Sequence, residues 1–224
     1  MSRSSRSSGE PTAVDRAIDT FRRGDPVCIH DADDREGETD IIYPATAVTP
    51  NAVSRLRNDA GGLICVAVDG EVADAFGLPF LQDVLDHPAA GDHDLTYDDR
   101  SSFSLPVNHR KTDTGITDED RSLTIRELAT AADTPEETAF ASSFRTPGHV
   151  HILRGATNLL ADRRGHTELG LTLAHAADQS PAVVVCEMLD DETGKAVAPE
   201  DAATYAEAQG IPFIEGAQLV ERFV

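Results

Sequence analysis

The sequence predicts one α/β or α+β domain in which helices cover a mixed β-sheet. Short apolar runs rich in β-branched residues, typical of buried strands, alternate along the 224 residues with segments of helical period. A hydrophobic content of 40% is ordinary for a folded chain of this length. Because no repeat and no Pro/Gly/Ser-rich linker divides the chain, we expect residues 11–224 to form a single domain after a disordered tail at residues 1–10.

The first half of the chain carries clear helix start and stop signals. Thr49 is an N-cap residue and Pro50 stands at the first helical position, so a helix begins there and ends at Gly61-Gly62. The elements expected in this half are, in order, a helix from Val14 to Phe21 that ends at Gly24, strands at 26–30 and 41–43, the helix after Thr49, a strand at 63–68, a short helix at 69–76 and a long polar loop at 82–100.

In the second half, two capping boxes predict where helices begin, Thr124-x-x-Glu127 and Thr134-Pro135-x-Glu137. Pro147-Gly148 predicts a fixed loop that presents His149 ahead of a strand. The other elements expected here are a strand at 103–107, a polar loop at 111–118, a strand at 150–153, a helix at 168–177, a strand at 181–188, a helix near 199–209, a strand at 211–214 and a terminal amphipathic stretch.

The charge balance excludes two classes of partner. The chain has 19 Lys+Arg against 40 Asp+Glu, a formal net charge of −21. Nucleic acid and anionic lipid surfaces both require a positive protein surface, so we expect neither as a partner. A local cationic pocket for a small phosphorylated ligand is still compatible with this charge.

Lysine is almost missing: it occurs only at Lys111 and Lys195, and the other cations are arginines. Carboxylates hold water and cations well, and at molar salt the Debye length of about 3 Å screens an excess of negative charge. We therefore predict a halophilic cytoplasmic protein. A merely acidic protein of an ordinary cytoplasm is the alternative.

The cysteines and the N-terminus also point to the cytoplasm. Cys28, Cys65 and Cys186 contain no CxxC pair, which favours a reducing compartment over a disulfide framework or a zinc cluster. Residues 1–9 lack an apolar core, so we expect neither a signal peptide nor an anchor. No apolar run reaches the roughly 18 residues of a membrane span.

Three segments could carry chemistry, and the first is Asp31–Asp40. Its carboxylates surround Arg35, and oxygen ligands of this kind suit Mg²⁺ or Mn²⁺. Gly37 would let the backbone bend so that neighbouring carboxylates face one centre. A solvated acidic loop is the alternative, and the spacing does not fit an EF-hand.

The second segment carries cationic groups, and the third set, Arg145-Thr-Pro-Gly-His149 with Glu187, carries groups for acid–base chemistry. Arg163-Arg-Gly-His-Thr167 precedes a predicted helix, where arginines and free backbone N–H groups form a phosphate cradle. His166 in this segment is either a metal ligand or a structural histidine. Glu187 follows an apolar strand, so it is partly desolvated and suited to general acid–base work, or it only begins the next polar loop. The same two interpretations apply to His149.

Taken together, five motifs in this order resemble the 3,4-dihydroxy-2-butanone 4-phosphate synthase family. They are Asp33-Asp-Arg-Glu-Gly-Glu-Thr-Asp40, Gly61-Gly-Leu-Ile-Cys65, Arg145-Thr-Pro-Gly-His149, Arg163-Arg-Gly-His-Thr-Glu168 and Val184-Val-Cys-Glu187. The family converts ribulose 5-phosphate into the four-carbon ketone phosphate and formate in riboflavin biosynthesis. The resemblance implies a three-layer α/β sandwich with a mixed sheet, a homodimer, a cytoplasmic location and Mg²⁺ (or Mn²⁺) as cofactor.

Two details of the resemblance concern the branch of the family. Gly37-Glu38-Thr39 resembles the archaeal members, and the His and Asp crowding at 86–99 departs from the bacterial ones. Many bacterial members continue into a GTP cyclohydrolase II domain, whereas this chain ends at Val224. We therefore expect a monofunctional enzyme whose catalytic domain is 11–224.

The resemblance also implies a role for each matching residue. Glu36 and His166 would hold the metal, with Glu38 assisting a second ion through water, and Cys65 would lie near the site. Asp40, His149 and Glu187 would be catalytic. The residues implied to contact the substrate are Arg35, Glu36, Asp40, Arg163, Arg164, Gly165, His166, Thr167 and Glu187.

Two other functions are weighed against this one. Another metal-dependent sugar-phosphate isomerase or aldolase would use the same residue types. A YrdC-like nucleotide-binding protein would need a basic concave surface, which a net charge of −21 makes hard to build. Release of formate from ribulose 5-phosphate separates the first interpretation from both.

Overall fold

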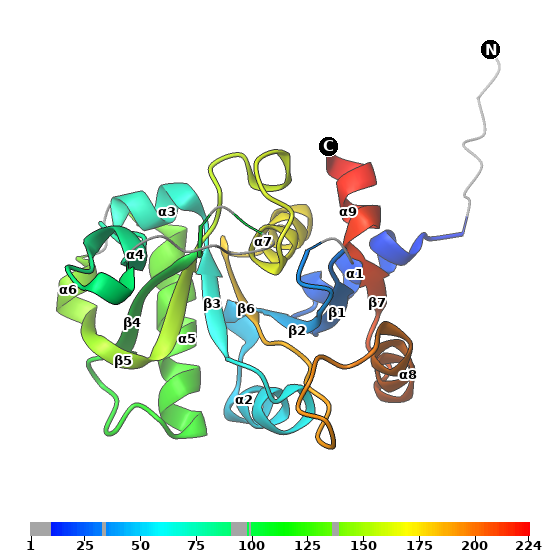
Figure 1. Ribbon diagram of the computed structural model, residues 1–224, viewed down its shortest axis with the longest axis horizontal. Helices are drawn as coiled ribbons and strands as arrows, with labels where there is room; N and C mark the ends of the chain where they lie inside the picture. The colour runs from blue at the N-terminus through cyan, green and yellow to red at the C-terminus, as the bar shows by residue number, and fades with distance from the viewer. Residues whose placement is uncertain (1–9, 33–34, 91–97, 99, 136–138) are drawn as a thin grey trace, which may run out of the picture.

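A seven-stranded sheet runs through the computed structural model, which describes residues 10–32, 35–90, 98, 100–135 and 139–224 (Figure 1). The strands are β1 (Val27–His30), β2 (Thr39–Pro44), β3 (Cys65–Val68), β4 (Phe103–His109), β5 (Phe144–Arg154), β6 (Ala182–Val185) and β7 (Phe213–Glu215). Their order is β4-β5-β3-β6-β2-β1-β7. β1 pairs with β7 and β3 with β5 in parallel, and the other pairs are antiparallel. The sheet is therefore mixed, as predicted.

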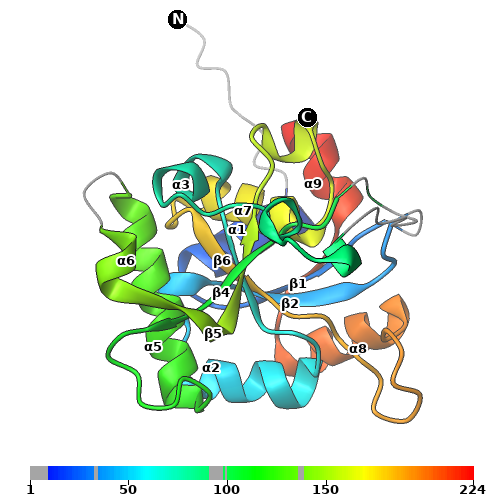
Figure 2. The same cartoon turned by 60° about the vertical axis from the view of Figure 1, so that its left-hand side comes forward.

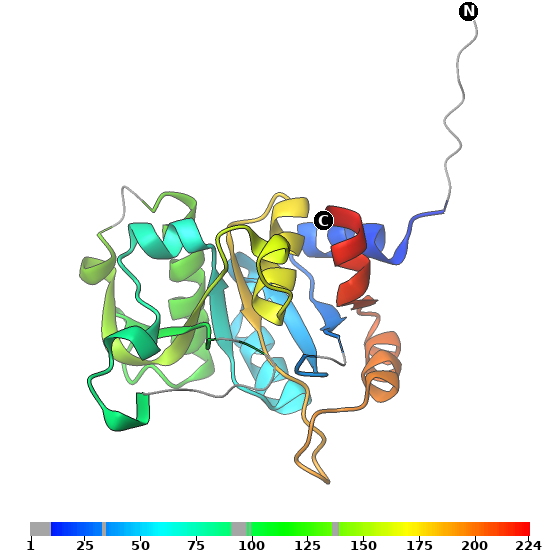
Figure 3. The ribbon, with the colours of Figure 1, turned by 45° about the horizontal axis from the view of Figure 1, so that its top comes forward.

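Helices cover both faces of the sheet, which confirms the three-layer α/β architecture (Figure 2). Successive strand residues point to opposite faces, and here both faces are apolar: Ile41 and Val184 belong to one core, Ile42 and Val183 to the other. The helices of the first layer are α2 (Pro50–Arg55), α5 (Asp118–Asp133) and α8 (Pro199–Gln209), and those of the second are α1 (Ala13–Arg22), α7 (His166–Ala176) and α9 (Gly216–Phe223). The C-terminal helix α9 lies beside α7 (Figure 3).

Most elements begin and end within a few residues of their predicted bounds, but one helix start is wrong. The capping box at Thr124 does not begin a helix, because α5 starts at Asp118 with Thr117 as its N-cap. The Thr117 hydroxyl accepts the N–H of Asp120 at 3.0 Å. Thr124 is instead buried inside α5, where its hydroxyl accepts the N–H of His109 in β4 at 3.0 Å. The Thr124 hydroxyl therefore accepts a hydrogen bond from a backbone N–H of β4 rather than from the start of a helix.

A second correction concerns the segment before the expected strand 150–153. β5 already begins at Phe144, so residues 145–149 are not a separate loop. Between Val107 and Asn108 of β4, however, the partner residue jumps from Val150 to Arg145, and residues 146–149 therefore bulge out of the ladder. Gly148 permits this approach, since a Cβ there would lie 1.9 Å from the Val107 carbonyl carbon.

Other parts of the prediction need short comment. The expected loop 82–100 starts with the helical turns α4 (Leu81–Val84) and Pro88–Ala90. The short helix expected at 69–76 is confirmed as α3 (Gly70–Ala75), whereas α6 (Phe140–Ser143) was not predicted. Further helical turns lie at Ala45–Ala47, Leu56–Ala60 and Leu159–Ala161. The tail at 1–9, residues 91–97 and 99 of the loop, and Glu137 of the second capping box lie outside the described residues. In the described part of the chain, no helix is both long and apolar enough to span a membrane.

Candidate active site

An acidic pocket of about 370 Å³ lies where β2, β3 and β6 meet the start of α7. It brings together side chains from segments far apart in the sequence. The predicted site residues that line it are Arg35, Glu36, Glu38, Asp40, Cys65, Arg163, His166, Thr167 and Glu187. The sequence motifs therefore converge on one cavity, with Arg164, Gly165 and His149 as the exceptions considered below.

His166 is the centre of this acidic pocket. It is the first residue of α7 and is 5% exposed. Its Nε2 lies 3.2 Å from the carbonyl oxygen of Ile29 in β1, and because a carbonyl only accepts, Nε2 carries the hydrogen. The other nitrogen, Nδ1, lies 3.5 Å from both Glu36 Oε2 and Asp40 Oδ1. The backbone thus turns Nδ1 toward the carboxylates.

The charges around His166 shift one another's pKa. Burial opposes protonation, but Asp40, Glu36 and Asp31 outweigh it and raise the pKa of His166 to about 9. Asp40 is 1% exposed, and burial together with Glu187 raises its pKa well above the ordinary value despite His166. The contact with His166 lowers the pKa of Glu36. At neutral pH the pKa of about 9 favours an imidazolium at His166, beside Glu36, whose pKa is lowered, and Asp40, whose charged form burial opposes.

Asp31 belongs to this cluster, although the sequence analysis gave it no role of its own. Its carboxylate accepts the N–H of Glu38 at 3.0 Å and that of Glu36 at 3.3 Å, which shapes the 31–38 loop between β1 and β2. Burial and the neighbouring Glu36 and Glu187 raise the pKa of Glu38. A carboxylate directly after a strand was the available signal for Asp31, but it did not distinguish this residue from its acidic neighbours.

These residues fit a divalent cation. One ligand atom each from Asp31, Glu36 and His166 lie within 4.8 Å of one another. The buried Asp40 Oδ1 has no hydrogen-bond partner among the described residues, which is costly unless a charged group faces it. Oxygen donors with one imidazole suit Mg²⁺ or Mn²⁺ better than a thiolate-preferring metal.

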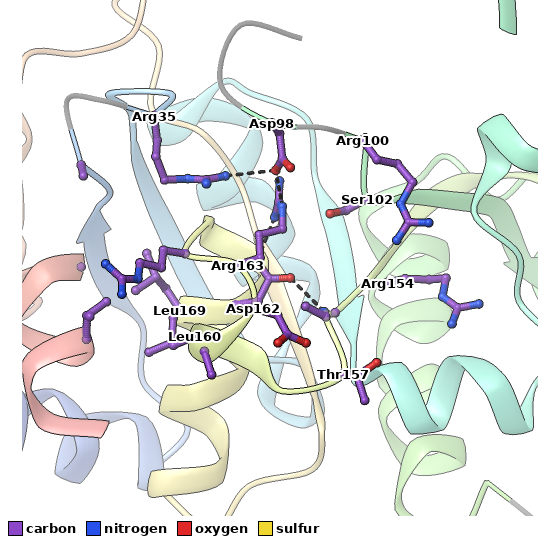
Figure 4. Close-up of a pocket in the computed structure, with 18 of the residues that line it drawn as sticks. Arg35, Asp98, Arg100, Ser102, Arg154, Thr157, Leu160, Asp162, Arg163 and Leu169 are labelled. Carbon is purple, nitrogen blue, oxygen red and sulfur yellow. Dashed lines mark hydrogen bonds and ion pairs between the residues drawn. The ribbon is translucent and has the colours of Figure 1, made fainter. Parts of the chain in front are cut away.

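A second, larger cavity of about 1170 Å³ adjoins the acidic pocket and shares Arg35, Arg100, Ser102 and Arg163 with it. We refer to it as the arginine pocket (Figure 4). Arg35, Arg100, Arg154, Arg163 and Arg164 all line it, in a chain whose net charge is −21. Such a concentration of guanidinium groups is suited to a phosphate or another small anion.

Carboxylates orient two of these arginines. Arg35 Nη2 lies 3.2 Å from Asp98 Oδ2, and Arg163 contacts the same oxygen through Nε (Figure 4). Arg163 Nη1 also donates to Glu168 Oε2 at 2.9 Å. Burial alone would raise the pKa of Asp98, but the two arginines lower it. Asp98 has no local signal in the sequence, because it meets its partners across more than 60 residues of chain. Glu168 belongs to the Arg163–Glu168 motif, but its role was not predicted.

The start of α7 completes the cationic side. Gly165 is its N-cap and offers no side-chain hydrogen bond, so the first-turn N–H groups are not capped by that residue. A Cβ at Gly165 would lie 2.5 Å from Arg163 Nη1, so the guanidinium packs directly on the backbone. Thr167 is buried beside it, whereas Arg164 is exposed at the rim of the arginine pocket.

Glu187 is half-buried, and a local irregularity of the sheet orients its carboxylate. The pairing of β3 with β6 shifts by one residue between Cys65↔Val185 and Gly61↔Met188. At this shift Glu187 Oε2 accepts the N–H of Leu63 at 2.8 Å, and its carbonyl accepts the N–H of Gly62 at 3.0 Å. The Gly61-Gly62 turn, predicted only as a helix end, thus also holds a candidate catalytic group.

Cys65 and His149 differ from the other predicted site residues in their surroundings. Cys65 lines the acidic pocket but is 2% exposed, and burial with the nearby carboxylates raises the pKa of its thiol. It is therefore a neutral, inert wall of the cavity. His149 is exposed in the bulge of β5 and is not one of the residues that line the acidic pocket.

The mixed three-layer fold, a buried acid–histidine cluster and an adjoining arginine-lined cavity define an α/β enzyme with a site for a small anionic substrate. The family model of 3,4-dihydroxy-2-butanone 4-phosphate synthase matches residues 15–222. The chain therefore belongs to the 3,4-dihydroxy-2-butanone 4-phosphate synthase family.

Named relatives agree with this assignment. The enzyme of that name from Archaeoglobus fulgidus is 49% identical over 221 residues, which cover 93% of both chains. The one from Methanosarcina mazei is 46% identical over 94% of this chain and 91% of its own length. These similarities to archaeal enzymes agree with the archaeal features of the acidic loop.

Solved structures of the family share the fold. The Candida albicans enzyme superposes with a TM-score of 0.78 at 30% identity and covers 95% of this chain and 98% of its own. A crystal structure of a 3,4-dihydroxy-2-butanone 4-phosphate synthase in complex with two magnesium ions superposes with a TM-score of 0.77 at 27% identity, covering 94% and 96%.

The Gly62 turn gives a direct test of how Glu187 is held. A Cβ at Gly62 would lie 2.4 Å from Glu187 Oε2 and 2.6 Å from its carbonyl oxygen, so Gly62→Ala must displace the carboxylate. We expect formate release, the activity that the resemblance implies, to fall by about 100-fold, the cost of misplacing a reacting group by about 1 Å.

Gly61→Ala is the matched control. Its φ of +87° imposes strain of about 1–2 kcal/mol, but the nearest atom to the added Cβ is Leu189 Cβ at 3.8 Å. This variant should lose thermal stability while its turnover stays near wild type. Equal turnover in the two variants would show that the Gly62 contact does not position Glu187.

Proposed function

We propose that this chain converts ribulose 5-phosphate into 3,4-dihydroxy-2-butanone 4-phosphate and formate, the riboflavin-pathway reaction of its family, with residues 11–224 as one catalytic domain. The observation that carries the proposal is the convergence of four of the five family motifs, whose residues line one acidic pocket beside an arginine-lined cavity. A sugar phosphate needs both parts, because its hydroxyl-bearing carbons undergo acid–base chemistry while its phosphate needs cations.

The reaction requires several proton transfers. A base removes the C3 proton to give an enediolate, an acid assists departure of the C1 hydroxyl as water, the skeleton rearranges, and water returns as C4 leaves as formate. The atoms of ribulose 5-phosphate are all found in the two products. These steps need groups that donate and accept hydrogen, and we assign them to Asp40, Glu187 and His149.

The individual side chains support different parts of this chemistry. Burial raises the pKa of Asp40, which suits this carboxyl group to donate a proton in a site shielded from water. Glu187 keeps one oxygen bound to the Leu63 N–H, which leaves the other free to exchange a proton. On the cationic side, Arg35, Arg163, Arg164, Gly165 and Thr167 would bind the phosphate at the start of α7.

Glu36 and His166 would hold a divalent ion, with Asp31 beside them and Glu38 reaching a second ion through water. Such an ion, Mg²⁺ or Mn²⁺, supplies positive charge that stabilises negative charge developing on substrate oxygens. The Ile29 carbonyl keeps Nδ1 of His166 directed at this place. To bind the phosphate, Arg163 must release at least one of its two carboxylate partners. Asp98 is the partner that a phosphate can replace, because it is partly exposed whereas Glu168 is fully buried.

We also propose a cytoplasmic homodimer from a halophilic organism. The support for a dimer is that His149 is exposed and separate from the lining of the acidic pocket, so a second chain over this face could bring it to a substrate. The support for salt adaptation is the net charge of −21 with only two lysines, Lys111 and Lys195.

Glu187→Gln tests the catalytic assignment. Glutamine keeps an oxygen that can accept the Leu63 N–H, so the fold should persist while proton exchange is lost. We expect formate release from ribulose 5-phosphate to fall by roughly 100- to 10,000-fold, with an unchanged melting temperature. Glu192→Gln, in an exposed turn, is the control and should be fully active. Consumption of ribulose 5-phosphate without formate by the wild type would contradict the proposed function.

Removal of the metal tests the proposed ligands. Chelation should abolish turnover and Mg²⁺ or Mn²⁺ should restore it. His166→Gln should weaken Mg²⁺ binding, measured by calorimetry, by at least the roughly 10- to 100-fold that loss of a supporting residue costs. His175→Gln lies on the same helix but is exposed and pairs with Asp69 at 2.7 Å, so it should bind Mg²⁺ normally. Equal affinities in the two variants would remove His166 from the ligand set.

Salt adaptation has a simple expected signature. Because molar KCl screens the repulsion among surface carboxylates, the melting temperature should rise by several degrees between low salt and molar KCl. Sucrose at equal osmolality controls for exclusion of a solute from the protein surface and should stabilise the chain less. The same melting temperature with and without KCl would make the chain an acidic protein without this adaptation.

A further inference from the structure

Asn108, a residue of β4 that the proposed mechanism does not use, lies within hydrogen-bond distance of both the backbone and the ring of His149. Its side chain is 3% exposed and reaches the bulge of β5. Asn108 Oδ1 accepts the backbone N–H of His149 at 2.8 Å. Because a backbone N–H can only donate, this bond fixes which end of the amide is oxygen and which is nitrogen.

The amide orientation in turn determines where His149 carries its proton. Asn108 Nδ2 lies 3.1 Å from His149 Nδ1. An amide NH₂ only donates, so Nδ1 must accept, and a hydrogen on Nδ1 would place two donors against each other. The Oδ1 atom is farther from Nδ1, at 3.3 Å, and already accepts the backbone N–H. Neutral His149 therefore has its hydrogen on Nε2.

The amide itself is held in this orientation from the other side. Gly115, with φ of +90°, packs directly against it, since a Cβ there would lie 2.0 Å from Asn108 Nδ2. The Gly115 N–H is bound by Asp120 Oδ2 at 2.8 Å in the first turn of α5. The buried amide thus has little freedom to rotate, and its donor needs the acceptor that His149 provides.

From these contacts we infer that Asn108 is a positioning residue that holds neutral His149 in the Nε2–H tautomer, so that His149 acts on the substrate as a hydrogen-bond donor. This inference rests on the proposed function for its substrate, and it narrows the role of His149. With Nδ1 engaged by the amide, a neutral ring can donate a hydrogen bond through Nε2, but it cannot accept a proton there. In the reaction, His149 therefore stabilises negative charge on a substrate oxygen through its Nε2–H, and proton removal from C3 falls to a carboxylate.

The first experiment needs no variant of Asn108. Two-dimensional ¹H–¹⁵N spectra of the ring distinguish a protonated from an unprotonated nitrogen, and the His149 signals are identified by their absence in His149→Gln. Above the titration of the ring, wild type should show a protonated Nε2 and an unprotonated Nδ1. A protonated Nδ1 would overturn the inference, whether or not the protein releases formate.

The second experiment separates tautomer control from simple bracing of the bulge. Asn108→Asp preserves shape and can still accept the His149 backbone N–H, but its carboxylate accepts from Nδ1–H and so reverses the tautomer. We expect a reversed ¹⁵N pattern and a kcat lower by about 100-fold or more, since a catalytic histidine held in the wrong tautomer can lose about 10⁴-fold, with KM within about threefold of wild type. Wild-type kcat with a reversed tautomer would overturn the catalytic consequence.

Asn108→Ala completes the comparison, because it removes both the brace and the donor. If Asn108 only braced the bulge, Ala would lower melting temperature and kcat while Asp would retain both, which would also overturn the inference. Absence of formate from wild type, with the Nε2–H tautomer present, would instead contradict the proposed function and leave the tautomer assignment in place.

Discussion

His166 is buried between Glu36 and Asp40, 3.5 Å from an oxygen of each, while its other nitrogen faces the Ile29 carbonyl. Without a positive charge at this place, several buried carboxylates would repel one another and give up their ionised forms. The imidazole satisfies this requirement from the first residue of α7, and a divalent cation beside Nδ1 would satisfy it with greater charge. The position of α7 against β1 and β2 is therefore tied to the electrostatics of the pocket as well as to the apolar core beneath it.

The cationic side of the site faces the opposite difficulty, because it has to be built in a chain with a net charge of −21. Arg163 is held by the fully buried Glu168 on one side and by Asp98 on the other. Burial raises the pKa of Glu168 against the effect of Arg163. The guanidinium and the Ala156 N–H, which both bind this carboxylate, favour its charged form. Asp98 contacts both Arg35 and Arg163. If these two arginines bind the phosphate as proposed, the phosphate has to compete with this carboxylate.

Regular periodicity and consecutive motifs made the fold and half of the site predictable. The strands were found because their residues are apolar on both faces, as Ile41 and Ile42 illustrate. The acidic loop and the Arg163–Thr167 segment were found because their chemistry lies in consecutive residues. Two of the misses depend on tertiary contacts. Thr124 looked like a helix cap until His109 of β4 used its hydroxyl, and Asn108 has a partner 41 residues away that no local pattern reveals.

The acidic composition itself mixes two populations that the sequence could not separate, since both consist of aspartate and glutamate. On the surface, the contact with Arg57 lowers the pKa of Asp118, and the Gly115 N–H lowers that of Asp120. In the acidic pocket, burial and neighbouring carboxylates raise the pKa of Asp40 and Glu38. The charged form is thus favoured for these two surface carboxylates and opposed for the pocket carboxylates. Burial rather than abundance decides which of the two behaviours an acidic residue shows.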